Sequence, residues 1–168
     1  MNAAALPRTR RAVPLAMAAA CALAVAAALF AQHVLGMRPC PWCILQRLLF
    51  ILIALVALGT AFAPTRRLRI ALNVTTLLLA CAGVIAAVYQ HEVAAKSFSC
   101  NLTFADKLVS ALGIESLWPW MFQVTASCAE SATKLLGVPF EFWSLALFAL
   151  LAIVSAGLVL RAIRVEAG

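Results

Sequence analysis

Residues 44–63 read ILQRLLFILIALVALGTAFA, a run of apolar side chains interrupted by one formal charge, Arg47. A helix needs about 20 apolar residues to cross a hydrocarbon core about 30 Å thick. Lipid offers no hydrogen-bond partners to the backbone, so a run of this length must satisfy its own peptide groups as a helix. The stretch therefore predicts a membrane-spanning helix.

Three further apolar runs extend this pattern, at approximately 12–35, 70–89 and 142–160, and none contains Asp, Glu, Lys or Arg. The chain is 65% hydrophobic and 11% charged, against about 45–50% and about 25% in a soluble domain. This composition excludes a soluble globular domain and a disordered chain. It also excludes a nucleic-acid-binding module, despite a net charge of +7. We predict an all-α membrane protein, in which residues 1–168 form one integral membrane domain with a four-transmembrane-helix bundle.

The basic residues predict how this bundle is oriented. Eight Lys and Arg residues lie in the N-terminal tail, the loop at 64–69 and the C-terminal tail, whereas the loops at 36–43 and 90–141 carry four. Cytoplasmic flanks are enriched in Lys and Arg. Both termini are therefore predicted to be cytoplasmic, and both cysteine-bearing loops to face the periplasm of a bacterial inner membrane. The short connections make the second helix the antiparallel neighbour of the first and of the third.

The first run also has a second interpretation. Arg8, Arg10 and Arg11 ahead of an Ala-rich stretch are typical of a signal peptide. The apolar part of a signal peptide is about 7–15 residues long, which is shorter than this run. Because three more spans follow, cleavage would leave an incomplete bundle, and we favour a retained first helix.

Residues 117–122, LWPWMF, stand out within the loop at 90–141. Trp prefers the headgroup region of a bilayer, so this loop is predicted to carry a short segment that lies along the membrane surface. In the alternative interpretation, the same aromatic side chains pack the loop onto the top of the bundle. Either arrangement holds the loop near the membrane plane.

The six cysteines divide into two groups under this topology. Cys21 and Cys81 lie inside predicted spans, where a buried thiol packs as a small apolar group. The other four lie in the predicted periplasmic loops, where an oxidising compartment favours disulfides. These four are Cys40, Cys43, Cys100 and Cys128. Four cysteines allow three pairings.

Cys40-Pro41-Trp42-Cys43 is a C-x-x-C motif. A bridge across so short a loop adds little loop-closure stabilisation, which favours redox chemistry over a structural role. The same spacing can form half of a zinc site, but zinc would need a second close pair, and Cys100 and Cys128 are 28 positions apart. That separation fits a loop-closing disulfide better, so we predict no metal site. Two purely structural disulfides remain the alternative.

The motif also predicts where the second helix begins. Pro41 disfavours helical geometry at Cys40 and suits the first position of a helix, so Cys43 is expected in the first turn. A helix N-terminus and a nearby cation favour the thiolate. The thiolate is the form of cysteine that attacks disulfides and electrophiles.

Arg47 shares a helix face with Cys43, four residues further on. An ionisable residue inside a span is a functional candidate by default, although an arginine one turn inside can also reach the headgroups. Gln46 could add a polar contact there, or simply satisfy a helix interface. His91, directly after the third run, is a further candidate for the same site, with ordinary solvation as its alternative.

At this point the residues resemble the bacterial disulfide bond formation protein B (DsbB) family of inner-membrane thiol:quinone oxidoreductases. The resemblance covers nearly the whole chain. It is carried by PCPWC at 39–43, QR at 46–47, QH at 90–91, SC at 99–100, SCAE at 127–130 and LGVP at 136–139.

The resemblance implies a relay through two disulfides. A periplasmic thioredoxin-fold dithiol oxidase of the DsbA type would attack the Cys100–Cys128 disulfide at Cys100, and Cys128 would then exchange with Cys40. Cys43 would pass the electrons to a membrane quinone, either ubiquinone or menaquinone. Arg47 would help to hold and polarise this quinone.

Two other functions fit parts of the pattern. A vitamin K epoxide reductase-like enzyme also combines a helical membrane bundle with a C-x-x-C motif and a quinone-type ligand. Its motif is expected late in the bundle, however, whereas this one opens the second span. The other possibility is a non-enzymatic membrane protein whose outer loop is stapled by disulfides.

Overall fold

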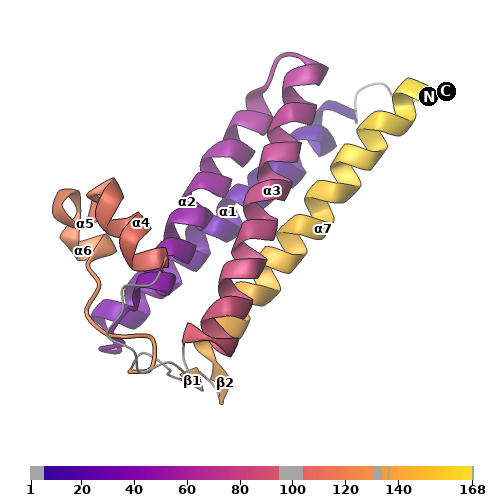
Figure 1. Ribbon diagram of the computed structural model, residues 1–168. Coiled ribbons are helices and arrows are strands. Elements are labelled where there is room, and N and C mark those ends of the chain that lie inside the picture. The colour runs from indigo at the N-terminus through magenta and orange to yellow at the C-terminus, as the bar shows by residue number, and fades with distance from the viewer. Residues whose placement is uncertain (1–5, 95–103, 131–133, 136, 168) are drawn as a thin grey trace.

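The computed structural model describes residues 6–94, 104–130, 134–135 and 137–167, and Figure 1 shows four long helices with a small layer of loop structure beside them. The long helices are α1 (Leu6–His33), α2 (Pro41–Phe62), α3 (Arg66–Glu92) and α7 (Phe140–Ala167). Each contains a segment long and apolar enough to cross a membrane. The prediction of an all-α, four-helix membrane protein is confirmed.

The helices differ from the apolar runs mainly at their ends. Helix α3 begins four residues before its run, because the Thr65 side chain caps it by accepting a hydrogen bond from the backbone N–H of Leu68. Helix α1 ends at His33, two residues before its run does. The chain turns there, through Gly36 in the left-handed conformation (φ 68°). Caps and turns therefore determine where the helices end, whereas the apolar runs in the sequence show only which residues are apolar.

The outward faces of the long helices are apolar. Large aliphatic side chains on them are 60–70% exposed, and these include Leu23, Leu55, Leu78, Ile85 and Ile153. Scattered single apolar residues are normal on a soluble protein, but contiguous apolar surface marks contact with a partner or a membrane. A surface of this kind around all four helices indicates that lipid covers the bundle.

The helices pack in chain order: α1 lies along α2, α2 along α3, and α3 along α7. The predicted neighbours of the second helix are thus confirmed. At the centre, the rings of Phe50 and Phe148 stack with centroids 4.1 Å apart. Gly83 on α3 leaves room for the fully buried Phe148. Both chain termini lie at one end of the bundle (Figure 1), and we call the opposite end, where α2 and α7 begin, the cysteine end.

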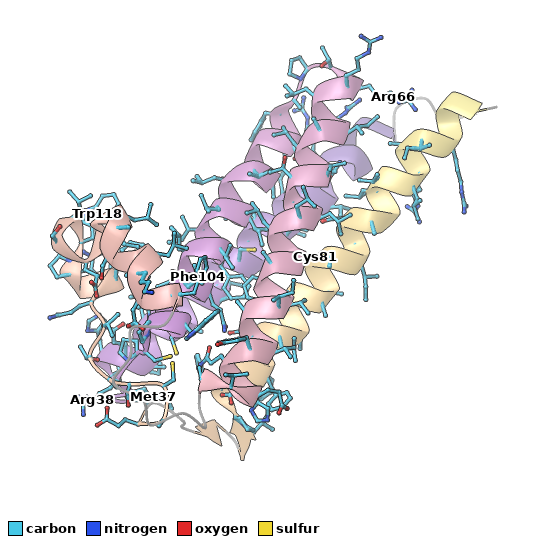
Figure 2. All side chains as sticks on the ribbon, in the orientation of Figure 1. Met37, Arg38, Arg66, Cys81, Phe104 and Trp118 are labelled. Carbon is cyan, nitrogen blue, oxygen red and sulfur yellow. The ribbon has the colours of Figure 1, made fainter. Side chains whose placement is uncertain are left out.

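The two cysteines within the spans have different surroundings. Cys21 is fully buried in the central apolar cluster, as predicted. Cys81 is exposed on α3 (Figure 2), so the expectation that it is buried among the helices is wrong. Since Cys81 is on a membrane-spanning helix, its apolar surroundings come from lipid and not from the protein core.

The loop after α3 folds beside α2 instead of over the bundle (Figure 1). It contains α4 (Phe104–Leu112), α5 (Ile114–Leu117) and α6 (Pro119–Phe122), followed by the two-residue strands β1 (Lys134–Leu135) and β2 (Val138–Pro139), which pair antiparallel. Buried Val109 and Phe122 attach the loop to Ile44 of α2. Trp118 and Trp120 are 61% and 56% exposed, so of the aromatics at 117–122 only Phe122 packs the loop onto the bundle, and the two tryptophans do not. The membrane-surface interpretation stays a prediction.

Replacing Gly83 by Ala is expected to destabilise the bundle. A Cβ at this position would overlap the ring of Phe148, and overpacking a core typically costs about 1–3 kcal/mol. Thermal unfolding in detergent measures the effect. Gly157→Ala on α7 is the matched control, because no atom lies within 4 Å of its new Cβ and Ala favours a helix by about 1 kcal/mol over Gly. Equal stability of the two variants would contradict the close packing of α3 on α7.

Candidate active site

The C-x-x-C motif forms the start of α2, as its sequence predicts. Cys40 is the N-cap residue, with φ −91° and ψ 168°, and Pro41 is the first helical residue. The Sγ atom of Cys40 accepts a hydrogen bond from the backbone N–H of Cys43 (3.3 Å), and the two sulfur atoms lie 2.8 Å apart. The pair is therefore placed to open and close a disulfide within one helical turn.

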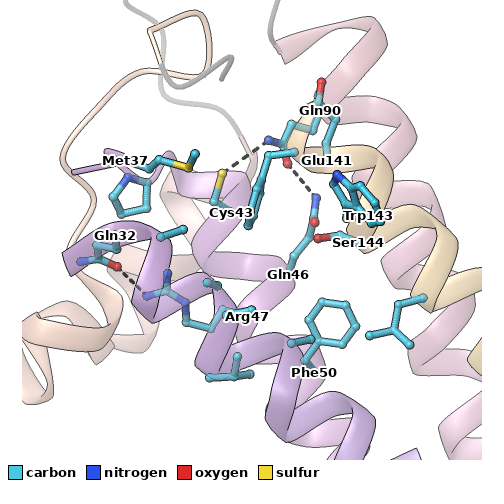
Figure 3. A pocket seen from close by; sticks show the side chains of 18 of the residues that line it. Gln32, Met37, Cys43, Gln46, Arg47, Phe50, Gln90, Glu141, Trp143 and Ser144 are labelled. Carbon is cyan, nitrogen blue, oxygen red and sulfur yellow. Dashed lines mark hydrogen bonds between the residues drawn. The ribbon is translucent and has the colours of Figure 1, made fainter. Parts of the chain in front are cut away.

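Two glutamines connect α2 to α3 beside this pair (Figure 3). Gln46 donates from Nε2 to Oε1 of Gln90 at 2.7 Å. Gln90 donates from its own Nε2 toward the Sγ atoms of Cys43, at 3.4 Å, and of Cys40, at 3.6 Å. Both amides are buried. The sulfurs of Cys40 and Cys43 therefore face the amide of Gln90, and Gln46 holds that amide by a hydrogen bond.

Arg47 points into the protein, with only 4% of its surface exposed. One terminal nitrogen donates to Oε1 of Gln32 on α1, at 2.9 Å, and to the backbone carbonyl of Met121 at the end of α6. Its Nε is buried and has no hydrogen-bond partner among the described residues. Arg47 is thus not a side chain that reaches out to the headgroups, but one that is held inside the protein.

A cavity of about 280 Å³ lies among α1, α2, the end of α3 and the start of α7. Figure 3 shows that Cys43, Gln46 and Arg47 line it together, next to Gln90 and Glu141. Its remaining wall is mostly apolar and includes Ala24, Val25, Ala28, Phe50, Trp143 and Leu147. An apolar chamber with a few convergent polar groups is typical of a site for a small organic molecule.

His91 lies at the edge of this site. Its Nδ1 is 2.9 Å from Oε1 of Glu141, and its ring meets Phe142 edge-on, with centroids 4.7 Å apart. Glu141 lines the cavity, whereas His91 is not among the described residues that do. His91 therefore reaches the cavity through Glu141.

The segment before Cys128 is tied to the residues before Cys40. The backbone N–H groups of Thr125 and Ala126 donate to the carbonyl of Pro39, at 3.1 and 3.3 Å. The Arg38 guanidinium donates to the carbonyl of Thr125, from Nε at 3.0 Å and from a terminal nitrogen. As a result, Cys128 and Cys40 belong to one buried cluster.

A local turn shapes the chain around Cys128. The Ser127 backbone N–H and hydroxyl both donate to Oε2 of Glu130, at 2.9 Å each. These two hydrogen bonds hold the pKa of the exposed Glu130 carboxyl below its usual value. Cys100, the predicted partner of Cys128, lies outside the described residues.

The sequence did not predict every polar residue of the site. Gln90 was noted only as part of a motif, and Gln32 and Glu141 were not singled out. Each is one polar residue at the end of an apolar helix, and its spacing gives no sign of what it faces. The described residues contain no group of three or more His, Cys, Asp and Glu side chains that could hold a metal ion.

Comparison with known proteins gives one family. The family model described as disulfide bond formation protein DsbB matches residues 10–158. The curated protein "Disulfide bond formation protein B 1" of Pseudomonas putida is 34% identical over 134 residues, which are 79% of this chain and 80% of that protein. Its namesake in Pseudomonas savastanoi pv. phaseolicola is 34% identical over 144 residues, 84% of each chain. "Disulfide bond formation protein B" of Herminiimonas arsenicoxydans is 30% identical over 146 residues, 87% of this chain and 92% of that one.

Replacing Arg38 by Ala is expected to loosen the segment before Cys128. The backbone bonds to Pro39 remain, but the Thr125 carbonyl loses its guanidinium donor. A hydrogen bond contributes about 0.5–1.5 kcal/mol, and more when one partner is charged. We expect amide hydrogen exchange at Thr125 and Ala126 to become about tenfold faster, since about 1.4 kcal/mol is a factor of ten. Arg67→Ala, at the other end of the bundle, is the control, and unchanged exchange in Arg38→Ala would show that the backbone alone anchors the segment.

Proposed function

This chain belongs to the DsbB family of disulfide bond formation proteins, membrane oxidoreductases that reoxidise DsbA, and we propose that it passes electrons from a DsbA-type thioredoxin-fold protein to a membrane quinone. One observation carries the proposal. Cys43, Gln46 and Arg47 line an apolar cavity, while Cys40 beside them shares a buried cluster with Cys128. The Cys40–Cys43 pair can thus exchange electrons with a protein through Cys128 and with a lipid-soluble molecule in the cavity.

The proposed relay follows the order of these contacts. A donor thiolate attacks Cys100 of a Cys100–Cys128 disulfide, and Cys128 leaves with the electron pair. The Cys128 thiolate then attacks Cys40, so that a Cys40–Cys128 bond forms, the Cys40–Cys43 bond breaks and the electron pair moves to Cys43. The anchoring of Thr125 and Ala126 to Pro39 supports this step, because it holds Cys128 within the cluster of Cys40.

The residues of the cavity fit a quinone. Its walls are largely apolar, and the guanidinium of Arg47, a lining residue, supplies hydrogen-bond donors for a carbonyl oxygen. Arg47 and Gln46 would hold the polar head beside Cys43, with His91 contributing through Glu141. When bound, the quinone accepts the two electrons and two protons and leaves as a quinol.

The same proposal places the protein in a bacterial inner membrane with its cysteine end in the periplasm. The excess of Lys and Arg at the opposite end supports this orientation. There, Arg66 also donates to the carbonyl of Ala162 near the end of α7. The vitamin K epoxide reductase-like and non-enzymatic interpretations are set aside, because the family match runs from residue 10 to residue 158 and the family is one of oxidoreductases.

The relay is tested by a variant that lacks the loop pair, Cys100→Ala with Cys128→Ala. We expect it to lose quinone reduction with a thioredoxin-fold dithiol protein as donor. It should keep quinone reduction with a small dithiol, which can reduce the Cys40–Cys43 disulfide directly. Cys81→Ala, which removes a thiol outside the site, should behave as the wild type. Wild-type turnover of the double variant with the protein donor would refute the two-pair relay.

Arg47→Ala tests the quinone side. We expect the apparent KM for quinone to rise and quinone reduction to slow by about 10–100-fold, since a hydrogen bond to a charged group contributes about 1.5–3 kcal/mol. Arg47→Lys should restore part of the rate, because Lys keeps the charge but loses the planar fork of donors. Single-turnover oxidation of the donor should change little, and Arg67→Ala serves as the control. Unchanged quinone kinetics in Arg47→Ala would remove Arg47 from the site.

A further inference from the structure

We propose that Gln90 is a catalytic residue, which donates a hydrogen bond to Cys43 and stabilises the negative charge on its sulfur once the Cys40–Cys43 bond has opened. The proposal deepens the proposed function, on which it rests for the direction of electron flow. It assigns Gln46 a second task, because Gln46 is the positioning residue that orients Gln90.

The geometry places the amide of Gln90 at both sulfurs. Gln90 is in the last two turns of α3 and is only 7% exposed. Its Nε2 is 3.4 Å from Sγ of Cys43 and 3.6 Å from Sγ of Cys40. An amide nitrogen carries two hydrogens, so one group can face both members of the pair. Cys40 is buried and Cys43 is partly buried, so Gln90 supplies hydrogen bonds to sulfurs that water reaches only in part.

The orientation of this amide is determined by its neighbour. Gln46 donates to Oε1 of Gln90 at 2.7 Å and is itself 4% exposed. If the Gln90 amide were rotated by half a turn, its NH₂ group would face the NH₂ group of Gln46 and its oxygen would face the sulfurs. That arrangement leaves buried donors without acceptors, which costs about 1–3 kcal/mol for each group. As long as Gln46 presents its NH₂ group, the donors of Gln90 face the sulfurs.

This contact matters when the electron pair arrives on Cys43. The charged and titratable groups around the pair are Arg47 on α2, His91 on α3, Glu141 on α7 and Arg38 before α2. Arg38 donates to the carbonyl of Thr125. Arg47 directs a terminal nitrogen to Gln32 and Met121, and His91 is engaged with Glu141. Among the described residues outside the cysteine pair, Gln90 is the one whose side chain donates a hydrogen bond directly to the sulfur of Cys43. Hydrogen bonds to an ionised partner are about twice as strong as neutral ones, so this bond strengthens as the thiolate forms.

A purely structural explanation also exists. Side-chain hydrogen bonds between transmembrane helices stabilise bundles by about 0.6 kcal/mol on average, and the Gln46–Gln90 bond joins α2 to α3. If this were its whole role, loss of either glutamine would lower stability to a similar degree and leave the reactivity of Cys43 unchanged. If Gln90 is catalytic, its loss should lower the reactivity of Cys43, and should do so more than the loss of Gln46.

The experiment measures alkylation of Cys43 by iodoacetamide in the full-length protein, with Cys40→Ser in every variant so that Cys43 is the one thiol of the pair. Alkylation reports the thiolate. We expect Gln90→Met to react about tenfold more slowly than the parent at neutral pH, and Gln46→Met about threefold more slowly, since a tenfold change corresponds to about 1.4 kcal/mol. Thr76→Val is the control: Thr76 is also a buried polar residue of α3, but its hydroxyl bonds to the Leu72 carbonyl of its own helix.

A second readout separates this proposal from the proposed function. With Cys40 restored, Gln90→Met should lower kcat for quinone reduction while leaving the quinone KM nearly unchanged. Arg47→Ala, in contrast, is expected to raise this KM. The alkylation assay uses neither donor protein nor quinone, so it stands even if the proposed function fails. Should Gln90→Met not fold, Gln90→Asn shortens the side chain by one methylene and should slow alkylation similarly. Alkylation at the parent rate in a folded Gln90 variant would overturn the proposal.

Discussion

The start of α2 at Pro41 is the constraint on which the rest of the site depends. Cys40 is extended and outside the helix, whereas Cys43 is inside it. The two sulfurs consequently face different surroundings, Cys40 toward the buried cluster with Cys128 and Cys43 toward the cavity. Gln46 and Arg47 follow Cys43 by about one turn, which brings an amide and a guanidinium to the same end of the cavity. A helix that began elsewhere would separate the dithiol from both groups.

Backbone hydrogen bonds help to hold the loop that carries Cys128. The carbonyls of Trp120, Met121 and Thr125 accept hydrogen bonds from three side chains at the cysteine end, His33, Arg47 and Arg38. A backbone group that is taken away from water must find another partner. These contacts meet that requirement and add to the apolar contacts of Val109 and Phe122 with Ile44. They also make Arg47 a member of both the cavity and the loop attachment, so the two parts of the relay share a residue.

The position of the cavity explains why a membrane bundle suits this chemistry. Protein donors are in water and quinones are in lipid, so the electrons must be handed over at the boundary between the two. The cavity is at the end of the bundle, with walls from α1 and α7 whose outer faces are apolar. Its polar lining includes Gln46, Arg47 and Glu141, which is paired with His91. The remaining wall is mostly apolar and can accommodate an apolar ring.

Features that depend on neighbouring residues could be predicted from the amino-acid sequence. Run length and composition predicted four helices, Pro41 predicted the start of α2, and spacing placed Arg47 on the face of Cys43. Which distant residues contact these groups became known only from the packing of the folded chain. Gln90 meets Gln46 across 44 positions and Arg38 meets Thr125 across 87, and a lone glutamine or arginine carries no pattern that names its partner. Helix periodicity acts over a few residues, whereas these contacts depend on how whole helices and loops pack, and the exposure of Cys81 was settled by the same packing.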